Sequence, residues 1–380
     1  MNKYDVIVIA TVRFCLVFIT KESTAEMSGC HPVSEFVSMA QSADDDMSEM
    51  LMLEHKEALD IEMVYQRGEP AKALETAGRM LEQTDDKIDR LMLLSTHMMA
   101  SIASADDQGA HSDLLQLLSL CKQVLESNPT EPLLGFALFC VARIEAVLAT
   151  DIIDYRVLET NIKHMHQTLR RGMGPILALY YIRRGRFQVA TGIAYACRTI
   201  VEPCDEIANI DLLILMASTH LIEGRIEDAC NDLMEAWRAS LKTGIVMPFV
   251  QLQYLLLGLQ KSVDINIDVM SETYRRIEFL TPKYRKGWFG LRERCGLSQK
   301  GFDLTPLEWD VVGLAALGWS NKEIAAHFAI SVNTVKHQLT SSYQKLGISK
   351  RTEIASVVRV VMAQTSRIKL DATGKAAHIS

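Results

Sequence analysis

Five polar residues between positions 333 and 344 are spaced so that they would share one face of a helix. At about 100° per residue, this face carries Asn333, Lys336, His337, Thr340 and Gln344. The opposite sector would be buried, and it holds Val335, Leu339, Ser342 and Leu346. Each of the five polar side chains can donate or accept a hydrogen bond at the edge of a base or at a phosphate. No acidic residue lies between Glu323 and Glu353, so this face would not repel a polyanion.

The helix that carries this face must be held by its neighbours, and the sequence marks where each helix begins. Ser331 is placed to cap the carrying helix, and Gly347 ends it. An earlier helix opens at Thr305-Pro306-Leu307-Glu308, which is a capping box with proline at the first helical position. A second capping box, Ser320-Asn321-Lys322-Glu323, opens a short helix between the two. A short helix, a tight turn and a longer helix together predict a helix-turn-helix.

A fourth helix is predicted to run from Ser349 through Val361. It carries more apolar residues than one core-facing side needs. The surplus residues are Val357, Val360, Val361 and Met362. We therefore predict that this helix forms a dimer seam.

Four motifs of this region occur in the order typical of LuxR/GerE regulators. They are Leu304-Thr305-Pro306-x-Glu308, Gly318-x-Ser320-Asn321-Lys322-Glu323-Ile324-Ala325, Ile330-Ser331-x-x-Thr334-Val335-Lys336 and Lys345-Leu346-Gly347-Ile348-x-x-Arg351. The chain resembles that family over about 60 of its 380 residues. The resemblance implies a four-helix DNA-binding domain over 301–365, whose third helix, 331–346, enters the major groove and whose fourth supports dimers. It also implies base contacts from Lys336, His337 and Thr340.

Further DNA contacts are predicted around the recognition helix. Residues at helix starts would meet phosphates after serving as caps or first-turn residues, because helix N-termini attract anions; they are Ser320, Asn321, Lys322, Ser331 and Thr334. Lys345, Lys350 and Arg351 are predicted to neutralise phosphates. For each cation the alternative is an ordinary solvated side chain. The sequence departs from the family at Leu307, Asp310, Trp319 and Gln338, so the target DNA sequence is not predicted.

Residues 39–280 read almost entirely as helices, with apolar residues at i, i+3, i+4 and i+7. Three junctions share the pattern G-x-x-x-x-A, at 68–73, 185–190 and 224–229. Their glycines are 117 and 39 residues apart, which fits a period of 39. Such a period is typical of stacked helical hairpins of the tetratricopeptide kind, and an irregular helical bundle is the alternative. The predicted fold is all-α, a hairpin array followed by the four-helix domain.

This layout resembles MalT-like LuxR regulators, in which a tetratricopeptide-like region precedes the DNA-binding domain. Those regulators carry a nucleotide-binding module, but G-x-x-x-x-G-K-[ST] is absent here, so no ATPase is predicted. Residues 281–300 are predicted to be a basic linker, broken by Pro282, Gly287, Gly290 and Gly296, with additional phosphate contact as the alternative. Residues 366–380 are predicted to be a tail.

The charge is distributed unevenly along the chain. Residues 301–380 hold nine Lys/Arg and six Asp/Glu, a net charge of +3. The whole chain has a net charge of −7, which leaves −10 for residues 1–300. The local positive field of the C-terminal part therefore suits phosphate despite the acidic total.

Residues 1–38 have no assigned role. The stretch from Tyr4 to Thr20 is mostly apolar, but it is short for a membrane span and is interrupted by Arg13. A cleaved signal or an anchor is not expected, because only Lys3 charges the front and no A-x-A site follows. A natural start at Met27 or Met39 is a further alternative.

No catalytic or metal-binding pattern emerges. His164 and His166 would point to different faces of a helix, and no C-x-x-C occurs among the eight cysteines. We therefore predict a cytoplasmic transcription regulator with reduced core thiols, which is not an enzyme and uses no metal or cofactor. The expected partners are double-stranded DNA, a second copy of the chain on DNA, RNA polymerase, and a protein or small-molecule effector at the helical region, but no membrane. The alternative is a helical scaffold whose C-terminal domain serves protein contacts.

Overall fold

A computed structural model describes residues 53–127, 129–149, 167–198, 206–256, 267–297, 304–316, 318–354, 369–370 and 376–377. Apart from turns and one pair of two-residue strands, β1 (Lys369–Leu370) and β2 (Ala376–Ala377), these residues are helical, which confirms the all-α prediction. The helices before the C-terminal domain are α4 (Lys56–Gln66), α5 (Pro70–Leu81), α6 (Lys87–Ala103), α7 (Asp107–Glu126), α8 (Glu131–Leu148), α10 (Gln167–Arg183), α11 (Phe187–Arg198), α12 (Glu206–Ile222), α13 (Ile226–Thr243), α14 (Met247–Leu252), η2 (Gln253–Leu255) and α15 (Ile267–Arg294). The proposed segment 1–38 lies outside the described residues.

Four of the described helix pairs are hairpins closed by the same kind of turn. The pairs are α4/α5, α6/α7, α10/α11 and α12/α13. Their turn residues Gly68, Ala105, Gly185 and Gly224 have φ between 62° and 79°. The alanine five positions later is buried in every case, at Ala73, Ala110, Ala190 and Ala229. The three G-x-x-x-x-A junctions are thus confirmed as turns, and the turn that a period of 39 places near position 107 is present with Ala105 in place of the glycine.

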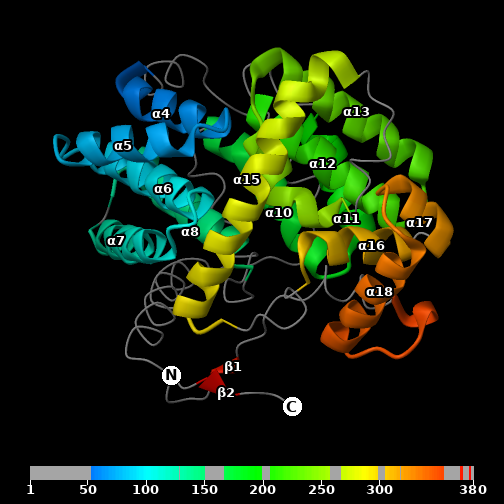
Figure 1. Cartoon of the computed structure of the whole chain (residues 1–380). Helices are drawn as coiled ribbons and strands as arrows, with labels where there is room; N and C mark the ends of the chain where they lie inside the picture. Colours follow the sequence, from blue (N-terminus) through cyan, green and yellow to red (C-terminus); the bar gives the residue numbers. More distant parts are fainter. Residues whose placement is uncertain are drawn as a thin grey trace, which may run out of the picture.

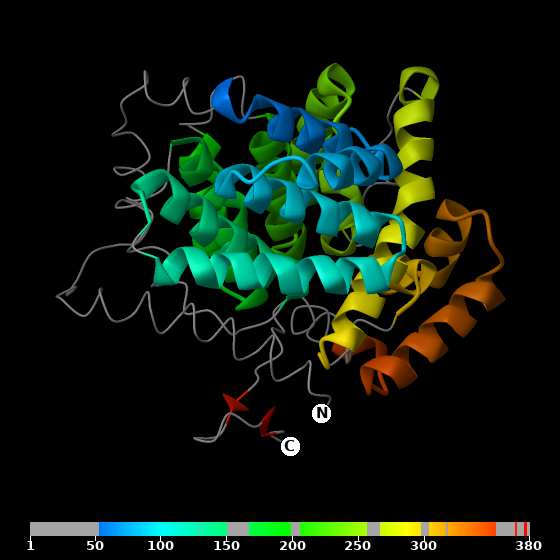
Figure 2. The same cartoon turned by 90° about the vertical axis from the view of Figure 1, so that its left-hand side faces the viewer.

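The first helices of the hairpins form a row. Helix α6 packs beside α4 and α8, and α10 packs beside α8 and α12. The second helices α5, α7, α11 and α13 each pack on the first helix of their own pair (Figures 1 and 2). The likeness to tetratricopeptide repeats stays a prediction.

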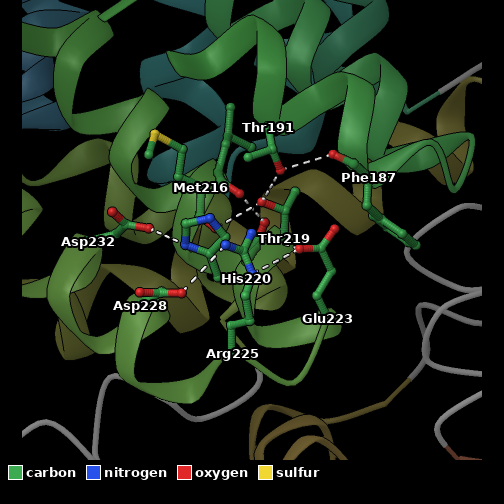
Figure 3. Close-up of polar contacts among 11 residues, drawn as sticks. Phe187, Thr191, Met216, Thr219, His220, Glu223, Arg225, Asp228 and Asp232 are labelled. Atoms are coloured by element: carbon green, nitrogen blue, oxygen red, sulfur yellow. Dashed lines mark hydrogen bonds and ion pairs between the residues drawn. The ribbon is translucent and has the colours of Figure 1, made fainter.

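The α12/α13 hairpin carries a polar network at its closed end, shown in Figure 3. His220, only 1% exposed, places Nδ1 2.7 Å from a carboxylate oxygen of Asp232. Thr191 of α11 donates to Thr219 at 2.8 Å. Burial raises the pKa of Asp232, while the charge and hydrogen bond of His220 oppose that rise. The pair therefore joins both helices of the hairpin.

The predicted linker is wrong for residues 281–294, because they belong to the 28-residue helix α15. Gly287 and Gly290 permit close packing instead of breaking the helix. A Cβ at Gly287 would come within 2.1 Å of the Ile102 carbonyl oxygen, and one at Gly290 within 2.6 Å of the Asp107 side chain. Only Gly296 acts as a stop, with φ of 68° just past the helix end. Glycine at these two positions thus allows α15 to approach α6 and α7 closely. The local sequence does not distinguish this use of glycine from a helix break.

Helix α15 packs on α6, α7 and α14, and it is fixed to the end of α8 (Figure 1). Trp288 donates its indole N–H to the Val147 carbonyl at 2.6 Å, and the fully buried Arg292 donates to the Leu148 carbonyl. Arg183 of α10 donates to the Ala146 carbonyl at 2.7 Å. These donors satisfy the last carbonyls of α8, where a helix carries partial negative charge.

The core of the described chain is apolar and holds most of its cysteines. Cys121, Cys140, Cys197 and Cys295 are buried and Cys230 is half-buried, and none of these five lies in a disulfide. Burial raises the pKa of Cys140 and of Cys197 to about 12, so both remain thiols. No helix in the described ranges combines the length and apolar character needed to cross a bilayer.

Candidate nucleic-acid interface

The described residues of the C-terminal domain form three α-helices, α16 (Pro306–Ala316), α17 (Asn321–His327) and α18 (Val332–Leu346). Helix α18 packs against both α16 and α17. The turn between α17 and α18 passes through Ala329, whose φ is 51°. A 3-10 turn, η4 (Arg351–Glu353), follows, and Ile354 after it is fully buried. The remainder of the predicted fourth helix and its dimer seam at Val357, Val360, Val361 and Met362 lie outside the described residues.

The predicted helix starts are confirmed by their hydrogen bonds. The Thr305 N–H donates to Glu308 at 2.6 Å, and the Glu308 N–H donates to the Thr305 hydroxyl at 3.2 Å. The same reciprocal pair joins Ser320 and Glu323, at 2.6 and 3.3 Å. At the start of α18 the Ser331 hydroxyl accepts from the Thr334 N–H at 3.0 Å. These hydrogen bonds satisfy backbone N–H groups at the helix N-termini and fix the residue at which each helix begins.

Helix α18 has the two faces that its periodicity predicts. Val335, Leu339 and Ser342 are buried, and Leu346 is half-buried. The opposite face is exposed at all five predicted positions, Asn333, Lys336, His337, Thr340 and Gln344. Figures 1 and 2 show α18 at the edge of the molecule, with this domain beside the array. The five side chains of this face are thus exposed to solvent.

Lys345 lies on α18 but points into the domain. Its ammonium is 2.7 Å from Glu308, whose side chain is only 4% exposed. The same carboxylate accepts from the Ser341 hydroxyl at 2.6 Å. Burial would raise the pKa of Glu308, but the hydrogen bonds from Lys345, Ser341 and the Thr305 N–H hold it below its ordinary value. Glu308 therefore joins the start of α16 to the last turns of α18, a role that its capping motif did not reveal.

Arg351 is engaged in a similar internal contact. Its guanidinium donates to the Asn321 side chain at 2.7 Å and to the Trp319 carbonyl. Two predicted phosphate-contacting residues, Asn321 and Arg351, are thus brought together and bind each other across the start of α17. Lys322 and Lys350 are exposed, as are Ser320 and Ser331 at the helix caps, while Thr334 is half-buried.

The domain also touches the array through α15. Arg285 donates to the Leu304 carbonyl just before α16. Burial lowers the pKa of Arg285 to about 10, and the negative charges of Asp310 and Glu308 act in the opposite direction. Sequence reasoning missed this contact because Arg285 lies in the stretch that it assigned to a linker.

Comparison with known proteins agrees with this geometry. The profile of the family described as "Bacterial regulatory proteins, luxR family" matches residues 303–358. No solved structure shows a significant match to the chain. The matched residues contain the three helices, their caps and the exposed face of α18. Residues 303–358 are therefore a helix-turn-helix domain of the luxR family, the DNA-binding module of a transcription regulator.

Proposed function

We propose that this protein is a sequence-specific transcription regulator that inserts α18 into the major groove of double-stranded DNA. The observation that carries the proposal is the exposed, acid-free face of α18 opposite its buried side. A helix fits the major groove, and polar side chains on its outer face can reach base edges there. Lys336, His337 and Thr340 are the proposed base readers, with Asn333 and Gln344 at the flanks.

Phosphate contacts are assigned to the residues that surround this face. Ser320, Lys322, Ser331, Thr334 and Lys350 lie at or next to helix starts. Asn321, Lys345 and Arg351 are assigned a positioning role, because their side chains already bind Glu308, Trp319 or one another. Phosphate contacts fix the register on DNA, whereas base contacts carry the sequence preference.

Control by the helical array is part of the same proposal. Helix α15 contacts the array along its length and reaches the domain through Arg285. We infer that effectors act on the array and that a second copy of the chain joins on DNA. RNA polymerase is a further proposed partner.

The decisive experiment is selection of bound sequences from a random DNA pool with the full chain, with a Lys336→Ala variant and with a Lys242→Ala control. Lys242 is exposed on α13, so its removal changes the net charge equally. Lys336→Ala is expected to weaken binding to the selected site by about 1–3 kcal/mol and to lose preference at one or two base pairs. Lys242→Ala should keep both affinity and preference.

An unchanged preference in Lys336→Ala would show that another face reads DNA. The scaffold alternative predicts a different result, namely no salt-sensitive binding to any duplex. For the regulator, the logarithm of the binding constant should fall steeply with the logarithm of salt concentration. Lys350→Ala should reduce that slope by about 1 without altering the selected sequence.

A further inference from the structure

The basic stretch of α15 holds more cations than its contacts within the fold use. Four of its arginines already bind a carbonyl or a carboxylate of another residue, and these are Arg276, Arg285, Arg292 and Arg294. Three further cations of the same helix are exposed, Arg275, Lys283 and Lys286. Among the described residues, none of these three has a hydrogen-bond or ion-pair partner. Helix packing therefore accounts for only part of the basic character of α15.

The three exposed cations share one side of the helix. Their spacings of eight and three residues place them within a sector of roughly 80° around the helix axis. Phe279, which is 62% exposed, lies in the same sector, and the Lys283 ammonium lies 3.9 Å from the centre of its ring. Arg275, Phe279, Lys283 and Lys286 together form the exposed stripe of α15.

The exposed stripe is positively charged, although the array as a whole is acidic. Of the three acidic residues between positions 272 and 294, Glu272 pairs with Arg276 at 3.3 Å, and Glu278 is hydrogen-bonded to Tyr274. The third, Glu293, is exposed and has no partner among the described residues. On α15 itself, three free positive charges thus stand against one free carboxylate, a net charge of +2. Such a surface attracts an anion that carries several charges along its length.

Two contacts in series join this part of α15 to α18. Arg285 donates to the carbonyl of Leu304, just before the capping box of α16. Glu308 closes that box and binds Lys345 at 2.7 Å and Ser341 at 2.6 Å, both on α18. Figure 2 shows α15 and the domain along the same edge of the molecule. The last turns of α18 are therefore held near the C-terminal half of α15.

A duplex that lies on α18 would extend past the end of this helix. Gln344, at the end of the exposed face of α18, is next to Lys345, while Lys283 and Lys286 lie within two residues of Arg285. The major groove is about 12 Å wide, so the phosphates that border it would pass beside the element packed at that end of α18. That element is α15.

We propose that the exposed stripe of α15 binds the phosphate backbone of the DNA that flanks the site read by α18. The inference rests on the proposed function, and it extends the DNA-binding surface from the domain into the helical array. Lysine and arginine neutralise phosphates without reading bases, so the stripe adds affinity and leaves the sequence preference unchanged. Because α15 is fixed to both α8 and the domain, an effector that shifts the array changes DNA affinity through this helix.

The test compares two duplexes that carry the sequence selected by the full chain. The short duplex ends at the borders of the selected site, and the long duplex adds one helical turn of about 10 base pairs on each side. The protein variants are Lys283→Gln/Lys286→Gln and, as the matched control, Lys72→Gln/Lys242→Gln, which removes two exposed lysines from α5 and α13. Binding constants of the full chain are measured over a range of salt concentrations.

On the long duplex, Lys283→Gln/Lys286→Gln is expected to bind at least about 5-fold more weakly than the wild type. The slope of the logarithm of the binding constant against the logarithm of salt concentration should become shallower by about 2, because two phosphate contacts are lost. On the short duplex this variant should bind like the wild type, and the control should match the wild type on both duplexes.

An equal slope for Lys283→Gln/Lys286→Gln and the wild type on the long duplex would overturn the inference and would leave an acidic protein segment as the occupant of the stripe. An equal loss of affinity on both duplexes would also overturn it, since the stripe would then make no contact with flanking DNA. Both results leave base reading by α18 standing, because the wild type still selects its sequence. If the wild type bound no duplex at all, the proposed function would fail together with this inference.

Discussion

The helix-turn-helix domain and the helical array each contain a carboxylate on one of their helices, but the two carboxylates differ in their hydrogen-bond partners. Glu308 in the domain accepts from Thr305, Ser341 and Lys345. Asp211 in the array accepts from none of the described residues. A fully satisfied carboxylate holds helices together, whereas a carboxylate without protein donors depends on solvent for its hydrogen bonds. The comparison separates a carboxylate that is paired within its domain from one that is half-buried and unpaired among the described residues.

The largest expected effect comes from breaking the ion pair between Arg143 and Glu62 in the helical array. Arg143→Ala would leave Glu62, which Arg143 now binds through two hydrogen bonds, as an uncompensated charge inside the protein. We expect the free energy of unfolding to fall by about 3–5 kcal/mol, as measured by urea denaturation. Arg225→Ala, which removes an exposed ion pair with Glu223, is the control and should change stability by less than about 1 kcal/mol. A similar loss of unfolding free energy in the two variants would mean that the Arg143–Glu62 pair does not stabilise the array.

A smaller loss is expected for the centre of the DNA-binding domain. Glu308→Ala removes the capping box of α16 and leaves Lys345 without its partner, so we expect unfolding of this domain to become easier by about 2 kcal/mol. Hydrogen exchange of α16 and α18 amides would measure it. Glu323→Gln keeps the exposed capping box of α17 and should have a much smaller effect. If Glu308→Ala left the exchange unchanged, neither the capping box nor the pair with Lys345 would stabilise the domain.

The smallest expected effects are the changes in stability with pH of variants at Asp211 and Glu308, and these changes have opposite signs. The pKa of Asp211 is raised to about 7, so the folded state binds its proton more tightly than the unfolded state. The stability from this group is complete below the unfolded value of 3.8 and is lost as the pH rises through about 7. Asp211→Asn should therefore become more stable than the wild type as the pH rises from about 5 to 8.

Glu308 should behave in reverse, because its pKa is lowered. Its contribution is present above the unfolded value of 4.5 and is lost as the pH falls through the lower folded value. Glu308→Gln should thus be less stable than the wild type at neutral pH, with a difference that shrinks in acid. Urea denaturation across this pH range measures both variants. Parallel pH profiles for Asp211→Asn and Glu308→Gln would contradict the comparison.

The sequence by itself determined the features that depend on residues within one or two helical turns. The caps at Thr305, Ser320 and Ser331 and the two faces of α18 follow from spacings of three and four residues, and the structure has them as predicted. The turns at Gly68, Gly185 and Gly224 could also be predicted from the sequence, because a backbone position in the left-handed conformation favours glycine. These are local relations, and they hold wherever the helix is placed.

Only the tertiary structure decided which polar residues meet. Lys345 and Arg351 were expected on phosphates, yet they bind groups 37 and 30 residues away in the sequence. Arg143 binds Glu62 across 81 residues, whereas the half-buried Asp211 has no partner among the described residues. Gly287 looked like a break and instead lets α15 approach α6. Such pairings depend on how helices stack, and helical periodicity alone does not specify which faces come together.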